Sequence, residues 1–125
     1  MTTREVVQKY FDCINTGDWE TWVALFDDNL VMDEALSGHL EGLQAMKDSA
    51  DGIQKGFQRF NNRIVEIVVE GNKAMVVCRI EAVTTTGVPL ASTGANFYRV
   101  ENGKIVYMSS YHDPAPFFKA FSGAQ

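Results

Sequence analysis

The chain has 125 residues, of which 46% are hydrophobic and 22% are charged, and this composition is typical of one folded domain with its own core. Its formal net charge of −5 disfavours nucleic-acid phosphates and anionic membrane surfaces as partners, and no cluster of lysine and arginine offsets that charge. No apolar run approaches the ~18 residues of a membrane span and no secretory signal pattern opens the chain, so we expect a cytoplasmic protein.

The N-terminal residues predict two helices and a brief strand. A capping-box motif, Thr2-x-x-Glu5, precedes apolar residues at helical spacing, which predicts a helix from about Thr3 to Thr16. Asp18 can then cap a short second helix that extends towards Phe26. Residues 30–33, Leu-Val-Met-Asp, follow as a short strand.

The rest of the chain changes from helical to β periodicity. Apolar residues three or four apart predict a third helix from about Glu41 to Phe60. Four runs rich in β-branched and aromatic residues follow, joined by connections too short for crossover helices: Ile64–Glu70, Lys73–Thr85, Leu90–Val100 and Lys104–Asp113. We therefore predict an α+β fold in which the helices pack on one face of an antiparallel sheet.

The last two strands should form a hairpin that ends in titratable residues. Asn102-Gly103 favours a type I′ turn, since both residues tolerate a positive φ. Pro114 cannot extend a central strand, so His112 and Asp113 should lie at the strand end. Whether this end is a reactive site or only a capped strand stays open at this point.

A few polar residues could carry chemistry in a pocket under the sheet. The acids are Asp33, Glu34 and Asp113, and a carboxyl group near apolar walls has its pKa raised to a useful range. Tyr10, in the apolar stripe of the first helix, and Asn96, in mid-strand, could donate hydrogen bonds to an oxyanion. Each of these residues also has a purely structural interpretation as a cap or a buried, satisfied polar group.

Other kinds of site find little support. The two histidines, His39 and His112, offer few nitrogen ligands for a metal, and no metal, phosphate-loop or nucleophile-elbow motif occurs. Cys13 and Cys78 are predicted to be buried free thiols. Phenylalanines beyond the last strand should cover the pocket mouth or a subunit contact: Phe117, Phe118 and Phe121.

Two long segments resemble a known superfamily. VVQKYFDCINTGDWETWVALFDDNLVMD (Val6–Asp33) and FYRVENGKIVYMSSYHD (Phe97–Asp113) are similar to the nuclear transport factor 2-like superfamily, in its SnoaL-like and ketosteroid isomerase-like branch. The resemblance implies a single domain over residues 1–125. Its curved antiparallel sheet would wrap as a cone around three N-terminal helices, and it would usually dimerise through the sheet.

The resemblance to ketosteroid isomerases implies cofactor-free proton transfer on an apolar carbonyl compound. Asp33 would then move the proton, while Tyr10 and Asn96 would donate to the oxyanion. The pocket wall would include His112, Met108, Tyr98, Phe57 and Trp22. No metal is implied.

Two alternatives remain. The SnoaL-type polyketide cyclases place an acid/base aspartate where Asp113 lies, after the Gly103-Lys104-Ile105 turn, although a Pro-Ala-Pro sequence follows it here. The third interpretation is a dimeric binding or accessory module that holds an apolar molecule without converting it.

Overall fold

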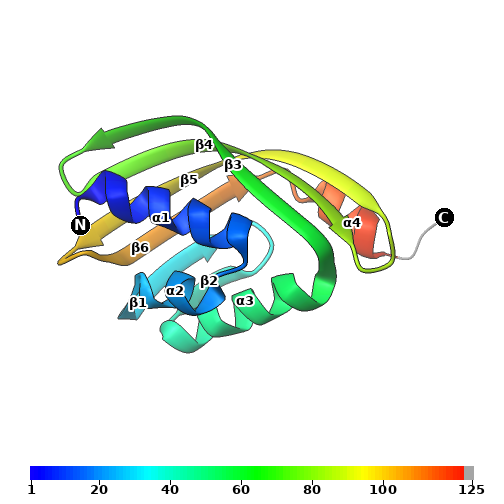
Figure 1. Ribbon diagram of the computed structural model, residues 1–125, viewed down its shortest axis with the longest axis horizontal. Helices are drawn as coiled ribbons and strands as arrows, with labels where there is room; N and C mark the ends of the chain where they lie inside the picture. The colour runs from blue at the N-terminus through cyan, green and yellow to red at the C-terminus, as the bar shows by residue number, and fades with distance from the viewer. Residues whose placement is uncertain (123–125) are drawn as a thin grey trace.

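Four helices occur in the part of the chain that the computed structural model describes, residues 1–122 (Figure 1). They are α1 (Thr3–Thr16), α2 (Trp19–Ala24), α3 (Leu43–Gly56) and α4 (Ala115–Phe121). The capping box of α1 is formed, because the Thr2 hydroxyl accepts from the Glu5 N–H and the Glu5 carboxylate accepts from the Thr2 N–H. The predicted bounds of α1 are confirmed.

Six strands form one sheet in the order β2-β1-β6-β5-β4-β3. Their bounds are β1 (Phe26–Glu34), β2 (Gly38–Glu41), β3 (Phe57–Glu70), β4 (Lys73–Thr84), β5 (Pro89–Glu101) and β6 (Lys104–His112). The antiparallel meander of the last four strands is confirmed. The sheet is not wholly antiparallel, however, since β1 pairs with β6 in parallel.

Turn glycines explain where several elements begin. Asn102 and Gly103 have φ values of 52° and 73°, as the predicted type I′ turn requires. Gly42 has a φ of 89°, so α3 begins only after it and β2, which the sequence analysis did not predict, occupies residues 38–41. The other missed element is α4, which starts directly after Pro114.

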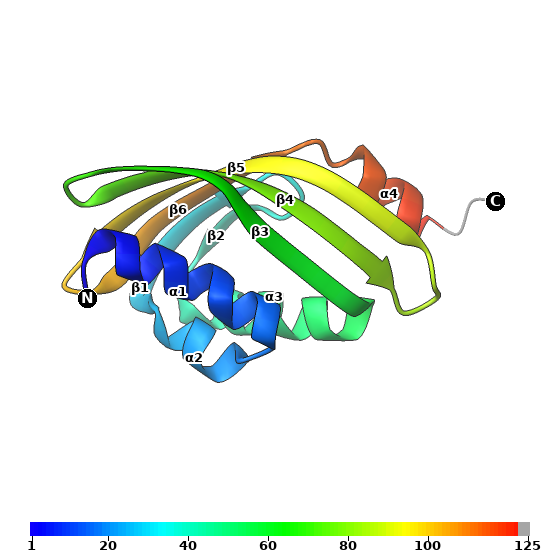
Figure 2. The ribbon, with the colours of Figure 1, turned by 45° about the horizontal axis from the view of Figure 1, so that its top comes forward.

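The sheet curves over the N-terminal helices. Figure 2 shows α1, α2 and α3 beneath its concave face, with α4 at the far end near the C-terminus. The main core lies between α1 and the sheet, where Val6, Phe11 and Tyr98 are almost fully buried. Cys13 and Cys78 are buried free thiols, as predicted. Within residues 1–122 no helix combines the length and the apolar character that crossing a membrane requires.

Candidate functional site

A cavity of about 970 Å³ opens between the concave face of the sheet and the helices. This volume lies at the upper end of the range for small-molecule sites, and its walls are mainly apolar. Each layer contributes a wall: Tyr10 from α1, Met46 from α3, Met108 from β6 and Phe117 from α4. The curvature of the sheet thus leaves room for a ligand beyond the packed core.

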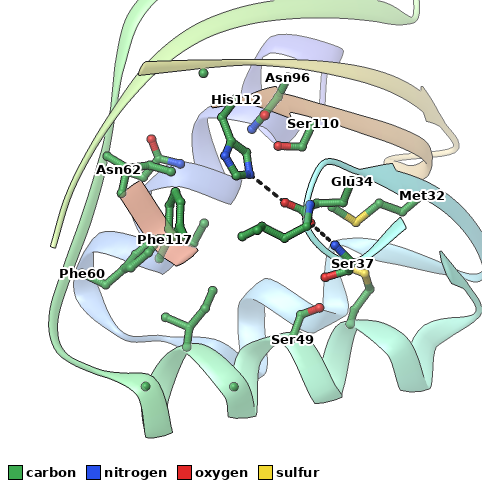
Figure 3. A pocket seen from close by; sticks show the side chains of 18 of the residues that line it. Met32, Glu34, Ser37, Ser49, Phe60, Asn62, Asn96, Ser110, His112 and Phe117 are labelled. Carbon is green, nitrogen blue, oxygen red and sulfur yellow. Dashed lines mark hydrogen bonds and ion pairs between the residues drawn. The ribbon is translucent and has the colours of Figure 1, made fainter. Parts of the chain in front are cut away.

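One acid–base pair lies on the cavity wall. His112 Nε2 is 2.8 Å from Glu34 Oε1, and the two side chains are only 5% and 14% exposed (Figure 3). The other carboxylate oxygen of Glu34 accepts from the N–H groups of Leu36 and Ser37, each at 2.7 Å. The β1–β2 turn and the end of β6 therefore hold this pair in place.

These contacts shift both groups towards their charged forms. Burial raises the pKa of Glu34, but hydrogen bonds from His112, Ser37 and Leu36 outweigh it, and the net pKa is lowered. The hydrogen bond to Glu34 raises the pKa of His112; burial opposes this shift, and the Asp113 carbonyl 3.3 Å from Nδ1 supports it. A carboxylate and an imidazolium therefore coexist in the cavity when the pH lies between the two pKa values.

The stability of the protein should depend on pH through this pair. The charge on His112 stabilises the fold fully below its ordinary pKa of 6.5, and this contribution is lost as the pH rises through the raised value. We expect His112→Asn to lower the free energy of unfolding by about 2 kcal/mol near pH 6, because Glu34 loses its charged partner.

Thermal unfolding of both proteins between about pH 6 and pH 9 measures this effect, and the difference in stability should shrink towards pH 9. His39→Asn is the comparison variant: His39 also pairs with carboxylates, those of Asp33 and Glu41, but it is half exposed and lies outside the cavity lining, so its pH-dependent loss of stability should be smaller. A stability difference that is the same at every pH would contradict the prediction.

A chain of polar groups runs from the sheet to the cavity. Asn96 Nδ2 donates to the hydroxyl of the fully buried Tyr98 at 3.0 Å, and the Tyr98 ring packs edge-on against Tyr10 at 5.2 Å between centroids. Burial is the main cause of the strongly raised pKa of Tyr10, and electrostatic interactions with Cys78 and Glu34 raise it further. Tyr10 therefore stays protonated and able to donate a hydrogen bond.

Asp33 lies on the other side of β1. Its carboxylate is half exposed, accepts from the Tyr107 hydroxyl at 2.7 Å, and lies 2.7 Å from His39 Nδ1. The prediction that Asp33 shares a cavity with Tyr10 is wrong, because neighbouring residues of a strand point to opposite faces. Glu34 faces the cavity instead. The sequence indicates this orientation, because Leu30 and Met32, which are both buried, lie on the same face of the strand as Glu34.

Asp113 also lies outside the main cavity. Its carboxylate accepts from the Ala115 N–H at 3.0 Å and borders a smaller hollow beside α4. This is the strand-capping role that was the alternative interpretation of the residue, and it follows from the chain turning at Pro114.

The remaining predicted site residues divide into two groups. Six of them line the cavity: Tyr10, Trp22, Phe57, Asn96, Met108 and His112. Tyr98 does not, because it lies wholly inside the core behind Tyr10. Asn96 lines the cavity, and one of its two amide N–H groups donates to Tyr98.

The comparisons with known proteins agree with this architecture. A family model, the SnoaL-like domain, matches residues 7–108. The chain belongs to the SnoaL-like family. None of the curated proteins matches it.

Solved structures of the nuclear transport factor 2-like superfamily share the fold of this SnoaL-like protein. An NTF2-like protein of unknown function from Cytophaga hutchinsonii is 24% identical, with a TM-score of 0.75 over 94% of this chain and 96% of that one. A candidate polyketide cyclase from Pseudomonas putida is 17% identical, with a TM-score of 0.82 over 96% and 98%. An LEH-like epoxide hydrolase from M. tuberculosis is 17% identical, with a TM-score of 0.81 over 96% and 89%. At these identities the likeness shows the fold alone.

Proposed function

We propose that this SnoaL-like protein catalyses cofactor-free proton transfer on an apolar carbonyl compound held in the cavity. The observation that carries the proposal is the Glu34–His112 pair, a buried acid–base pair on the wall of a large, mainly apolar cavity. His112 is the group that exchanges the proton, and Glu34 positions the imidazole ring and sets its pKa.

The two ring nitrogens of His112 have different tasks in this proposal. Nε2 is committed to Glu34 at 2.8 Å, whereas Nδ1 has only the longer 3.3 Å contact with a backbone carbonyl. Neutral Nδ1 therefore takes the proton from the carbon next to the carbonyl of the ligand. The electron pair of the broken C–H bond moves onto the carbonyl oxygen, and His112 then returns the proton to a carbon of the same enolate.

Tyr10 is the donor for the enolate oxygen. Its raised pKa keeps the hydroxyl protonated, and its position on the cavity wall lets it donate to the developing charge. Asn96 acts through Tyr98 in this scheme, since one of its two amide N–H groups donates to the Tyr98 hydroxyl. Asn96 is thus a positioning residue in this scheme.

Exchange of hydrogen for deuterium tests the proposal without knowledge of the product. The protein is incubated in D₂O with a panel of cyclic and aromatic ketones, and loss of the α-proton signal is followed by NMR. Accelerated exchange that is absent with His112→Asn supports proton transfer. Ketones that bind to the protein without any accelerated exchange would favour a binding module and contradict the proposal.

We also propose that a second copy of the chain covers the outer face of the sheet. Cross-strand neighbours form an apolar band there, since Val77 lies opposite Ala95 and Ala95 opposite Tyr111, with Met75 in the adjacent row. Met75, Val77 and Tyr111 are exposed, which is unusual for large apolar side chains gathered on one face.

Charging this band should therefore convert a dimer into a monomer. We expect Val77→Glu to halve the mass measured by light scattering or native mass spectrometry, because burying the added carboxylate at an interface is unfavourable. Val88→Glu is the matched control, since Val88 is also exposed but lies in the turn between β4 and β5, outside that band. A wild-type monomer at micromolar concentration, or a dimer that survives Val77→Glu, would contradict the proposal.

A further inference from the structure

The charged groups that line the cavity are unevenly distributed. No lysine or arginine occurs among the lining residues in the described part of the chain, whereas Glu34 and Asp48 both do. His112 is the one basic side chain there, and Glu34 balances its charge at 2.8 Å. Asp48, which is also exposed to solvent, is therefore the one lining carboxylate with no matching cation among the lining residues of the described part of the chain.

Asp48 lies on the face of α3 that borders the cavity. Lining residues recur along this helix four positions apart, at Asp48, Gly52 and Gly56. The contact described for the Asp48 carboxylate is with the neutral amide of Gln44, at 3.0 Å. A Cβ added at Gly52 would meet nothing within 4 Å, and both residues are exposed, so this stretch of the cavity lining is open to solvent and to a ligand that enters from it.

Tyr10, which lines the cavity from α1, also indicates that the cavity disfavours negative charge. Burial and the charge of Glu34 both raise the pKa of its hydroxyl, which means that the surroundings disfavour a further negative charge on this oxygen. The formal charge of the whole chain, −5, acts in the same direction on a ligand that approaches from solvent.

We infer that the cavity selects its ligand by charge: it takes an uncharged molecule or one with an amine, and it rejects carboxylates, sulfates and phosphates. An amine would lie near Asp48, whose carboxylate would pair with its charge. An anion would meet no unmatched cation. The inference rests on the cavity being the ligand site, as in the proposed function, but not on any catalytic step.

The residues that line the cavity indicate which chemical class of ligand it selects, in addition to the ligand size that it admits. The lining phenylalanines and methionines suit a flat apolar body, and the polar end of the ligand then decides between binding and rejection. Substrates attached to a soluble carrier through a phosphate group near the reacting atoms are therefore outside the class of ligands that the cavity should bind.

Three naphthalene probes of nearly equal size test the inference: 2-naphthalenemethanol, 2-(aminomethyl)naphthalene and 2-naphthoate. Their affinities for the whole chain are measured by calorimetry or by ligand-observed NMR at low salt. We expect 2-naphthoate to bind at least about tenfold more weakly than the other two probes. Asp48→Asn should remove any advantage of the amine over the alcohol, while Asp51→Asn, which changes an acid outside the lining, should leave it unchanged.

A variant that should gain affinity for the anionic probe complements the variants that should lose affinity for the amine. Gly52→Lys adds a cation to open space on the cavity wall and should raise the affinity for 2-naphthoate. Equal affinity of the wild type for 2-naphthoate and the alcohol, or no binding of the alcohol and the amine, would overturn the inference. The expected order of affinities without any α-proton exchange would leave the inference standing and contradict only the proposed function.

Discussion

Replacement of His112 by asparagine should slow the α-proton exchange of a bound ketone by roughly 10²–10⁴-fold, the usual contribution of a general acid or base. The structural reason is that His112 is the titratable group on the cavity wall with a ring nitrogen not committed to a short hydrogen bond. Rates measured by NMR in D₂O at saturating ketone give this factor directly.

The matched controls are the two acids that sequence reasoning favoured. Asp33→Asn and Asp113→Asn should each leave the exchange rate within about twofold of the wild type, since both carboxylates lie outside the cavity lining. Loss of exchange in either variant, with His112→Asn still active, would contradict the assignment of His112. One of these two acids would then be the group that exchanges the proton.

Glu34→Gln separates a positioning role from a structural one. Because Glu34 raises the pKa of His112, its removal should lower that pKa. Exchange requires neutral His112, so the rate rises with pH through this pKa, and the midpoint of the profile should move to lower pH in the variant. A lower rate with an unchanged midpoint would indicate that Glu34 serves only the folding of the β1–β2 turn.

The second large effect is expected at Gly94, which lies directly opposite His112 in the pairing of β5 with β6. A Cβ added there would lie 2.9 Å from the Tyr111 carbonyl oxygen and 3.3 Å from His112 Cβ. The first contact is with backbone and cannot be relieved by a rotamer change. We therefore expect Gly94→Ala to destabilise the protein by about 1–3 kcal/mol and to move His112 away from Glu34.

Chemical denaturation measures the first part of this prediction, and the exchange rate of the folded variant measures the second. Gly52→Ala is the control, since the added methyl group meets nothing within 4 Å and favours the helix. An alanine at position 94 that is tolerated without loss of stability or exchange would show that β6 shifts freely and that the place of His112 is not set by this contact.

The sequence allowed the framework of the fold to be predicted, but only part of the site. Local signals sufficed for α1, where the capping box sets the start, and for the Asn102-Gly103 turn, where two positive φ values are needed. The missed elements are short: β2 depends on pairing with β1, and α4 depends on packing of Phe117 against Ile80 and Leu90. Such tertiary contacts leave little periodicity in seven residues or fewer.

The error over the pocket acid has a different cause. Asp33 and Glu34 are adjacent acids, and composition does not distinguish them, because only the phase of the strand decides which one points inward. The predicted strand ended at Asp33, so the phase was not carried on to Glu34. His112 was placed on the correct face because β6 is long and its alternation is clear from Met108 onwards.

The pairing of β1 with β6 shifts between Phe26 and Val31, and this irregularity precedes the two acids. One residue inserted or deleted there would exchange Asp33 and Glu34 between the concave and convex faces. The carboxylate would then keep its position in space while its position in an alignment changed by one. Acids in proteins of this fold should therefore be compared by the face of the strand on which they lie, and not by their column in a sequence alignment. One relative with aspartate at the position of Glu34 and another with an acid one residue earlier can present the same carboxylate to the cavity.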